Sequence, residues 1–221
     1  MKISSIVTTC RREGVSYLEG TLASLREAGF EPDVMLDHHL KGSYPNFKDA
    51  LEFASHGDVD AVVVFQDDIR VSRGLRDWLD DLWPTKLNQH GFGVVSLYTA
   101  GPYDASVDGW QQFDMSMKFD GDIPWSRWFG ALAFLFPIGF ARRFLKDNPR
   151  PEILNATDRN VAEWCAKNGI PLLFHSPSLV QHVGEVSTFQ KRRLKDIPLP
   201  PGFVDCRTAK RFCEEVSQLS T

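Results

Sequence analysis

The segment Asp60-Ala-Val-Val-Val-Phe-Gln-Asp-Asp-Ile69 decides the fold class of this chain. Its apolar part, Ala61 to Phe65, contains three consecutive valines. Such a run is typical of a strand that is buried on both faces, as in a parallel sheet covered by helices. The strand ends abruptly in Gln66, Asp67 and Asp68. In an open α/β sheet, polar residues at the carboxyl ends of the strands line the crevice where ligands bind.

The two adjacent carboxylates of Asp67 and Asp68 repel each other, and their charge is costly unless a cation neutralises it. The pair therefore indicates a site for a cation at this strand end. An ordinary solvated turn that contains two acids is the alternative interpretation. The elements on either side of the segment decide between the two.

The first third of the chain alternates between strand-like and helix-like patterns. The expected elements are a strand at Ile3 to Thr9, a helix at Tyr17 to Ala28, a strand at Pro32 to Leu36, a helix at Asn46 to Ser55 and the Ala61 strand. This alternation predicts right-handed crossovers and a parallel sheet. Gly29 follows the first helix, as a C-cap glycine does.

The rest of the chain continues the alternation less regularly. We expect strands at Phe92 to Tyr98, Gly130 to Pro137, Leu172 to Phe174 and Pro177 to His182, and helices at Arg73 to Leu82, Gly139 to Lys146, Thr157 to Gly169 and Thr208 to Leu219. The glycine- and aromatic-rich stretch from Tyr103 to Arg127 has no sustained period. A loop of that length is more often functional than decorative, with a small β-extension as the alternative.

The composition bounds the class of protein. A chain of 221 residues, 43% hydrophobic and 24% charged, is most simply one soluble globular domain. A net charge of −4 gives no basic signature of a nucleic-acid-binding surface. The four cysteines lack metal-type or disulfide-framework spacing. With no signal-peptide layout and no apolar stretch long enough to span a bilayer, we expect a cytoplasmic protein.

Polar clusters follow the first three predicted strands, at Thr8 to Arg12, Asp37 to His39 and Gln66 to Asp68. Because the carboxyl ends of parallel strands share one edge of a sheet, these clusters should converge. Hydroxyls, a guanidinium and carboxylates together suit a phosphorylated ligand that carries a divalent metal. His182, after the last predicted strand, could add a nitrogen ligand and favours manganese over magnesium.

With these segments in order, the chain resembles the GT-A-type glycosyltransferases. Thr8-Thr9 before Arg11, and the helix that contains Thr21 to Leu25, resemble the first strand and helix of that fold. Asn46 to Leu51, followed by Gln66-Asp67-Asp68-Ile69, resembles its asparagine helix and acidic motif. Many relatives have Glu where this chain has Gln66, whose amide can still bond a ribose hydroxyl.

The carboxyl-terminal part of the resemblance is the segment Pro177-Ser-Leu-Val-Gln-His-Val-Gly184, with Ser187-Thr188 close behind. Similar segments carry a histidine ligand in enzymes that extend glycans from nucleotide-sugar donors. The resemblance implies a Rossmann-like, mostly parallel central sheet flanked by helices in a single domain over residues 1–221. Residues 1–98 would form the nucleotide-binding half, 99–190 the acceptor and metal half, and 191–221 a tail.

Residue by residue, the resemblance implies the following roles. Asp68 and His182 would be the protein ligands of the metal, and Asp67 would help through water or the donor sugar. The nucleotide-sugar donor, such as a UDP-sugar, would be bound by Thr8, Arg11, Asp37, Asn46 and Gln66, with Gly130 letting the backbone approach the sugar. For Arg11, Asp37 and Asn46 the alternative is a loop or cap role, and for His182 a satisfied core histidine.

Transfer with inversion needs a base that takes the proton from the acceptor hydroxyl. Asp158 is the candidate, because the fold commonly places its base near the start of this helix, although an acid there is also favoured by the helix dipole. Asp120 and Asp122 are reserve candidates. Trp110, Phe113, Trp125, Trp128 and Phe129 could form an acceptor platform or simply be core.

Together with the resemblance, these features predict a metal-dependent, inverting glycosyltransferase that moves a sugar from a nucleotide-diphosphate donor to an acceptor hydroxyl. The acceptor expected from the resemblance is a cell-surface glycan. A hydroxymethylated DNA base is less favoured, with Lys191 to Arg193 and Lys195 as phosphate contacts. The alternatives are a nucleotidyltransferase that acts on a sugar phosphate, although Thr8 to Gly14 lacks its glycine-rich loop, and a non-catalytic nucleotide- or sugar-binding module.

Overall fold

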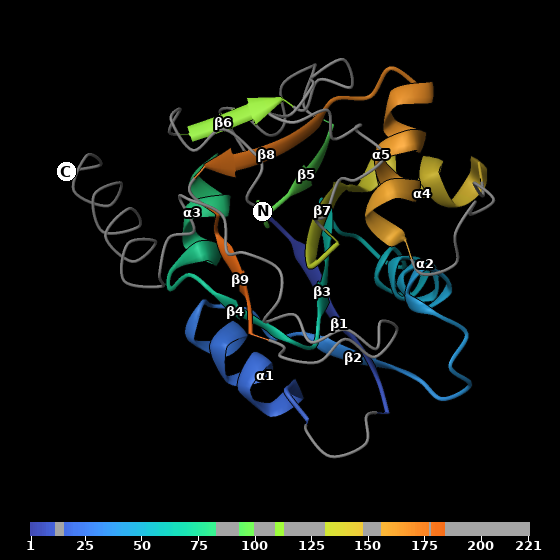
Figure 1. Ribbon diagram of the computed structural model, residues 1–221. Helices are drawn as coiled ribbons and strands as arrows, with labels where there is room; N and C mark the ends of the chain where they lie inside the picture. The colour runs from blue at the N-terminus through green and yellow to red at the C-terminus, as the bar shows by residue number, and fades with distance from the viewer. Residues whose placement is uncertain are drawn as a thin grey trace, which may run out of the picture.

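A computed structural model describes residues 1–11, 16–82, 93–99, 109–112, 131–147, 156–176 and 178–183. Within these ranges the chain forms one α/β unit around a seven-stranded sheet with the order β2-β1-β3-β7-β5-β8-β6 (Figure 1). The strands are β1 (Ile3–Cys10), β2 (Asp33–Asp37), β3 (Ala61–Gln66), β5 (Val94–Ser96), β6 (Gly109–Gln112), β7 (Ala133–Pro137) and β8 (Leu172–Ser176).

The sheet is mostly parallel, as predicted. β1 pairs in parallel with both β2 and β3, and β5 pairs in parallel with β8. β7 lies between the two groups and is antiparallel to β3 and to β5, so five strands share one direction. β6 closes the far edge and is antiparallel to β8. The direction of β7 could not be read from its residues, because a strand buried on both faces has the same apolar pattern in either direction.

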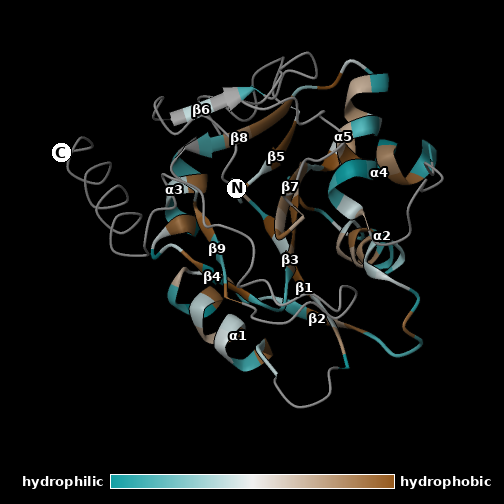
Figure 2. Cartoon of the chain, in the orientation of Figure 1, coloured by the Kyte–Doolittle hydropathy of each residue, from teal (hydrophilic) through white to brown (hydrophobic). Residues whose placement is uncertain are grey.

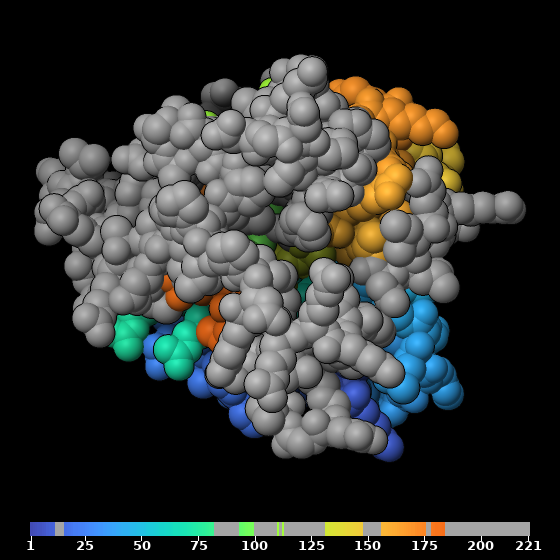
Figure 3. Space-filling model, viewed as in Figure 1, coloured from blue at the N-terminus to red at the C-terminus, as the bar shows by residue number. Residues whose placement is uncertain are grey.

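Helices cover both faces of the sheet (Figure 1). α1 (Leu18–Glu27) and α3 (Leu75–Leu82) pack on one face, and α2 (Ser43–Ala54), α4 (Ile138–Asp147) and α5 (Thr157–Lys167) pack on the other. In the space-filling view, α2 and α5 are visible on the right-hand side of the molecule (Figure 3). The protein is therefore a three-layer α/β/α domain, which confirms the predicted fold class.

Alternate residues of β3 feed two separate cores. Val62 and Val64 belong to the core under α2, α4 and α5, whereas Ala61, Val63 and Phe65 belong to the core under α1 and α3. All five side chains are buried, and Figure 2 shows the hydrophobic colouring of the central strands. The valine run is apolar throughout because it has no solvent-facing side.

A second sheet of two strands stands apart from the main one. β4 (Ile69–Val71) pairs antiparallel with β9 (Val180–His182), with Ile69 opposite His182. β4 was not predicted, because three residues are too few to show a period. β4 begins directly after the acidic end of β3. Its pairing with β9 therefore brings the segment that follows Asp68 next to the segment that carries His182.

Several element boundaries differ from the predictions. α2 begins at Ser43 and not at Asn46, because Pro45 lies in the first turn, where its missing N–H is tolerated. Within the described residues 93–99, the strand expected at Phe92 to Tyr98 pairs at Val94–Ser96. β6 matches the β-extension considered for the Tyr103 to Arg127 stretch. The rest of that stretch, Gly130 and the expected Thr208 helix lie outside the described residues.

Candidate active site

Asp68 and His182 meet although they lie 114 residues apart in the sequence. The His182 Nε2 atom is 3.2 Å from Asp68 Oδ2. The backbone supports this contact, because the amide of Val183 donates to the carbonyl of Asp68 at 2.9 Å. The antiparallel register of β4 and β9 thus places the two side chains predicted as metal ligands next to each other.

The donor atoms of this pair suit a divalent cation. The 3.2 Å separation is that of a hydrogen bond between the two side chains, and a carboxylate oxygen and an imidazole nitrogen are both atoms of the kind that bind divalent cations. Carboxylate oxygen with imidazole nitrogen is a set that manganese accepts more readily than magnesium. Within the described ranges, no group of three or more His, Cys, Asp or Glu side chains gathers as a metal site. Two protein ligands would leave the remaining positions to water and to ligand oxygens.

The two carboxylates of the acidic motif have different partners. Asp67 is 5% exposed and Asp68 is 6% exposed, so neither charge is solvated by bulk water alone. The Thr9 hydroxyl donates to Asp67 Oδ2 at 2.5 Å, whereas Asp68 Oδ2 faces His182. Because a buried carboxylate needs hydrogen bonds or an opposite charge, these contacts stabilise the pair and separate the roles of its members.

The ends of β1 and β3 are adjacent, as the predicted convergence requires. Thr8 is paired in register with Gln66, and the Thr8 hydroxyl donates to the carbonyl of Phe65 at 3.0 Å. Asn46 reaches across from α2, and its Nδ2 donates to the carbonyl of Thr9 at 3.3 Å. Thr8, Asn46 and Gln66 thus lie around the acidic turn.

Asp37 also lies at this edge, beside Cys10 in the register of β1 and β2. Its carboxylate is buried at 3% exposure and turns inward. Oδ1 accepts the backbone amides of His39 and Lys41, at 3.3 and 3.0 Å, and Oδ2 accepts that of Gly42 at 3.1 Å. The observed role of Asp37 is to hold the loop that leads into α2. This corresponds to the loop role considered as the alternative for Asp37.

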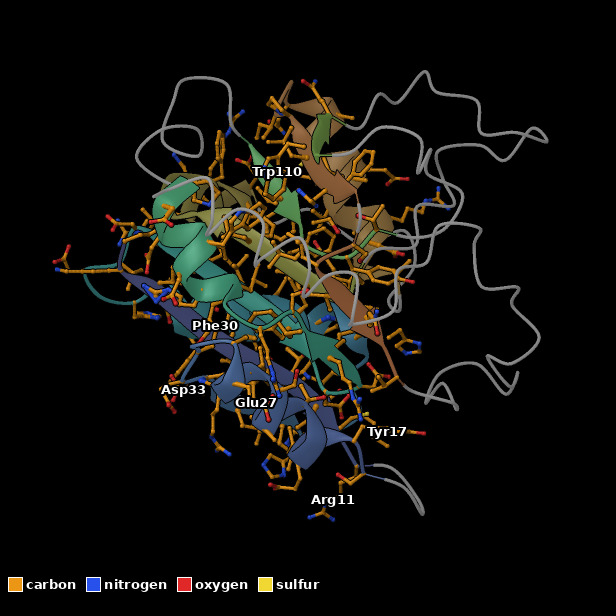
Figure 4. All side chains as sticks on the ribbon, turned by 90° about the vertical axis from the view of Figure 1, so that its left-hand side faces the viewer. Arg11, Tyr17, Glu27, Phe30, Asp33 and Trp110 are labelled. Atoms are coloured by element: carbon orange, nitrogen blue, oxygen red, sulfur yellow. The ribbon has the colours of Figure 1, made fainter. Side chains whose placement is uncertain are left out.

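Arg11 is exposed at the end of β1 and projects away from the body of the protein (Figure 4). Gly130, predicted to approach the donor sugar, lies outside the described residues. So do Asp120, Asp122 and most of the expected acceptor platform.

Trp110, the member of that platform that the structure describes, lies at the other end of the molecule from Arg11 (Figure 4). Its ring stacks on Trp78 of α3 with centroids 5.4 Å apart, and it meets His175 edge-on at 5.0 Å. Because His175 and Trp78 are buried, this cluster packs β6 and β8 against α3. Trp110 therefore has a packing role, the alternative considered for the platform residues.

Asp158 occupies the first turn of α5, and its Oδ1 accepts the backbone amide of Arg159 at 2.9 Å. A neighbouring contact links α5 to α2, since the hydroxyls of Thr157 and Ser43 are 3.3 Å apart. α2 starts at the edge of the sheet where β2 ends, and it carries Asn46. The first turn of α5 therefore lies on the same side of the domain as the acidic turn.

Tyr44 lies in the first turn of α2, near this edge of the sheet. Burial raises the pKa of its phenol well above the ordinary value, so it remains protonated at neutral pH. Burial also raises the pKa of Tyr98 at the end of β5. Neither phenol is therefore suited to act as a base at neutral pH.

Two site residues were missed by sequence reasoning, namely Thr21 and Ser24 of α1. The Thr21 hydroxyl lies 2.8 Å from the carbonyl of Asp67 and 3.0 Å from that of Ile69, and it accepts the amide of Ile69 at 3.1 Å. The Ser24 hydroxyl accepts the amide of Val71 at 2.8 Å. The sequence feature that could have indicated them is the presence of hydroxyls among the leucines of an amphipathic helix. The sequence does not show which groups those hydroxyls bond.

No family model matches the chain, and no curated protein matches it significantly in sequence. Similar solved structures include the inositol-1-phosphate CTP transferase from T. maritima, at 10% identity and a TM-score of 0.44, over 98% of this chain and 78% of that one. Another is residues 1–349 of TarS from S. aureus, at 16% identity and a TM-score of 0.48, over 81% and 59%.

A third similar structure is a CMP:2-keto-3-deoxy-manno-octonic acid synthetase complexed with CTP. Its identity is 12% and its TM-score 0.46, over 99% of this chain and 100% of that one.

No helix in the described part of the chain is long and apolar enough to cross a membrane. The assignment of an activity therefore rests on the residues of the site.

Proposed function

We propose that this chain is a metal-dependent glycosyltransferase of the GT-A type, which transfers a sugar with inversion from a nucleotide-diphosphate donor to an acceptor hydroxyl. The observation that carries the proposal is the 3.2 Å contact between His182 and Asp68 at the end of a central parallel strand. These are the two residues that the family resemblance assigns to the metal. A solvated turn with two acids would not bury both acids or require a histidine from a distant segment.

In this function Asp68 and His182 hold the metal, with manganese favoured over magnesium. When bound, the metal neutralises the charge that develops on the departing nucleotide diphosphate. Asp67 orients the donor sugar or a water in this proposal, and its hydrogen bond from Thr9 supports that role. Thr8, Asn46 and Gln66 surround the nucleotide, and Arg11 approaches its phosphates from solvent.

The reaction is a direct displacement at the anomeric carbon. The acceptor oxygen forms the new bond to this carbon as the bond to the diphosphate oxygen breaks, and the diphosphate keeps that electron pair. Asp158 takes the proton of the acceptor hydroxyl. Its place at the start of α5, at the same edge of the sheet as Asp68, supports this role.

A panel of nucleotide sugars, UDP-sugars included, tests the proposal by release of nucleoside diphosphate with manganese or with EDTA. Release that depends on manganese in the wild type, and that is lost in Asp68→Asn, is expected. Asp58→Asn is the matched control, because Asp58 is an exposed acid paired with Lys2. Equal release by wild type and Asp68→Asn would overturn the proposal.

The same panel separates the alternatives. A nucleotidyltransferase would instead release pyrophosphate from CTP or UTP when a sugar phosphate is supplied. A binding module would bind nucleotide without turnover, and Asp158→Asn would have no turnover to lose.

For the acceptor, a glycan is favoured over a hydroxymethylated DNA base. Turnover on DNA would fall steeply with salt, whereas turnover on a neutral glycan would not.

A further inference from the structure

Among the residues that the structure describes, the short strand β4 pairs with one other strand, β9. Its residue Arg70 pairs with Gln181 of β9. The backbone groups of Ile69 and Val71 point to the opposite edge, because successive residues of a strand alternate in direction. Buried amides and carbonyls at such an edge need partners, and no strand of the described chain supplies them there.

Two hydroxyls of α1 supply them instead. The Thr21 hydroxyl accepts a hydrogen bond from the amide of Ile69 and lies within hydrogen-bond distance of the Ile69 carbonyl. The Ser24 hydroxyl accepts a hydrogen bond from the amide of Val71 at 2.8 Å and lies 3.4 Å from the Val71 carbonyl. Residues three apart lie on one face of a helix, so both hydroxyls face the same strand. Hydroxyls within helices usually bond the carbonyl one turn back, but these two bond another element.

Thr21 also contacts the turn that carries Asp67 and Asp68. Its hydroxyl lies 2.8 Å from the carbonyl of Asp67, directly before Asp68. On the other side of the turn, the carbonyl of Asp68 accepts the amide of Val183, next to His182. The turn is thus held between α1 and β9, with Asp68 in the middle.

We propose that Thr21 and Ser24 are positioning residues that replace a third strand beside β4 and thereby hold Asp68 against His182. The inference rests on the proposed function for the role of that pair in binding metal. Partners that orient metal ligands typically change metal affinity 10–100-fold when they are removed. The hydroxyls of α1 are such partners, acting through the backbone.

The first test needs neither metal nor substrate. Hydrogen exchange at the Val183 amide is measured by NMR in the wild type, in Thr21→Val, which has the shape of threonine without its hydroxyl, and in Thr21→Ser, which keeps it. We expect exchange about tenfold faster or more in Thr21→Val, since losing a buried partner releases the turn. Thr21→Ser should exchange like the wild type.

The matched control is Ser55→Ala. Ser55 is a buried serine at the end of α2 whose hydroxyl donates to its own helix at Leu51. Its loss should leave exchange at Val183 unchanged. If Thr21→Val does not fold, Ser24→Ala tests the same clamp through the amide of Val71, which should exchange faster in that variant. Unchanged exchange at the tested amide, or an equal rise in Ser55→Ala, would overturn the proposal.

The second test is manganese affinity, followed by the electron paramagnetic resonance signal of the free ion. Thr21→Val should bind manganese about 10–100-fold more weakly than the wild type, with Thr21→Ser close to the wild type. Wild-type affinity in Thr21→Val would overturn the positioning role and leave the proposed function standing. Wild-type manganese affinity in Asp68→Asn would instead contradict the proposed metal site. The hydrogen-exchange result would still decide whether the hydroxyls hold the turn.

Discussion

The Thr9 hydroxyl donates to Asp67 Oδ2 at 2.5 Å, so the first acid of the motif is bound to β1 while the second faces His182. The two acids should therefore respond differently to the same substitution. Asp68→Asn should weaken manganese binding by about 100-fold or more, because it removes a ligand. Asp67→Asn should weaken it by about 10-fold, the lower end of the range for supporting partners. Manganese titration followed by paramagnetic resonance measures both, and an equal loss in the two variants would contradict the division of roles.

The buried carboxylate of Asp37 should matter for stability before it matters for ligand binding. Asp37→Asn replaces one acceptor oxygen by an NH₂ group that cannot accept the amides of the 39–42 loop. We expect a loss of about 1–3 kcal/mol in the free energy of unfolding of the ligand-free protein. Urea denaturation measures it. Asp33→Asn, at the exposed start of the same strand, is the control, and an unchanged stability in Asp37→Asn would exclude the loop role.

Cys10 lies directly before Arg11 and two residues after Thr8, both candidate nucleotide contacts, and it is partly exposed. Alkylation at Cys10, read by mass spectrometry of its peptide, should slow several-fold when UDP and manganese are bound. Cys165 is the internal control, because burial raises the pKa of its thiol and hides it from the reagent. Labelling of Cys10 that is indifferent to nucleotide would place the ligand elsewhere.

Phe144 is the centre of the core between α4 and its neighbours. Its ring meets those of Tyr44, Phe47, Phe136 and Trp164 at centroid distances of 5.0–6.4 Å. Phe144→Ala should cost about 3–5 kcal/mol of unfolding free energy, because it removes a fully buried ring. Phe53→Ala is the matched control, since Phe53 is 53% exposed on α2. Similar small losses in both variants would contradict the described core.

The sequence was sufficient for the features that local patterns determine. The valine run of β3 predicted a strand buried on both faces, and its acidic end predicted where Asp67 and Asp68 lie. The convergence of Thr8 and Gln66 followed from parallel strands alone. These predictions succeeded because burial on both faces, and the alternation of strands with helices, leave a pattern in neighbouring residues.

What the sequence did not show depends on contacts between distant segments. The reversed direction of β7 and the pairing of β4 with β9 require partners that no local pattern specifies. The partners of Asp37 were also not visible in the sequence. Its place at a strand end suggested a ligand contact, whereas its oxygens accept the amides of the following loop. Thr21 stood among the leucines of an amphipathic helix, and the backbone edge that it serves became visible only in three dimensions.

The central claim is that Asp68 and His182 act together in holding a metal for a nucleotide diphosphate. Titration calorimetry of UDP with manganese or with EDTA measures it in the wild type, in Asp68→Asn, in His182→Ala and in the double variant. We predict that manganese strengthens UDP binding only in the wild type, and that the double variant loses no more than either single one, because both side chains serve the same ion. Full manganese dependence of UDP binding in Asp68→Asn or in His182→Ala would contradict the account.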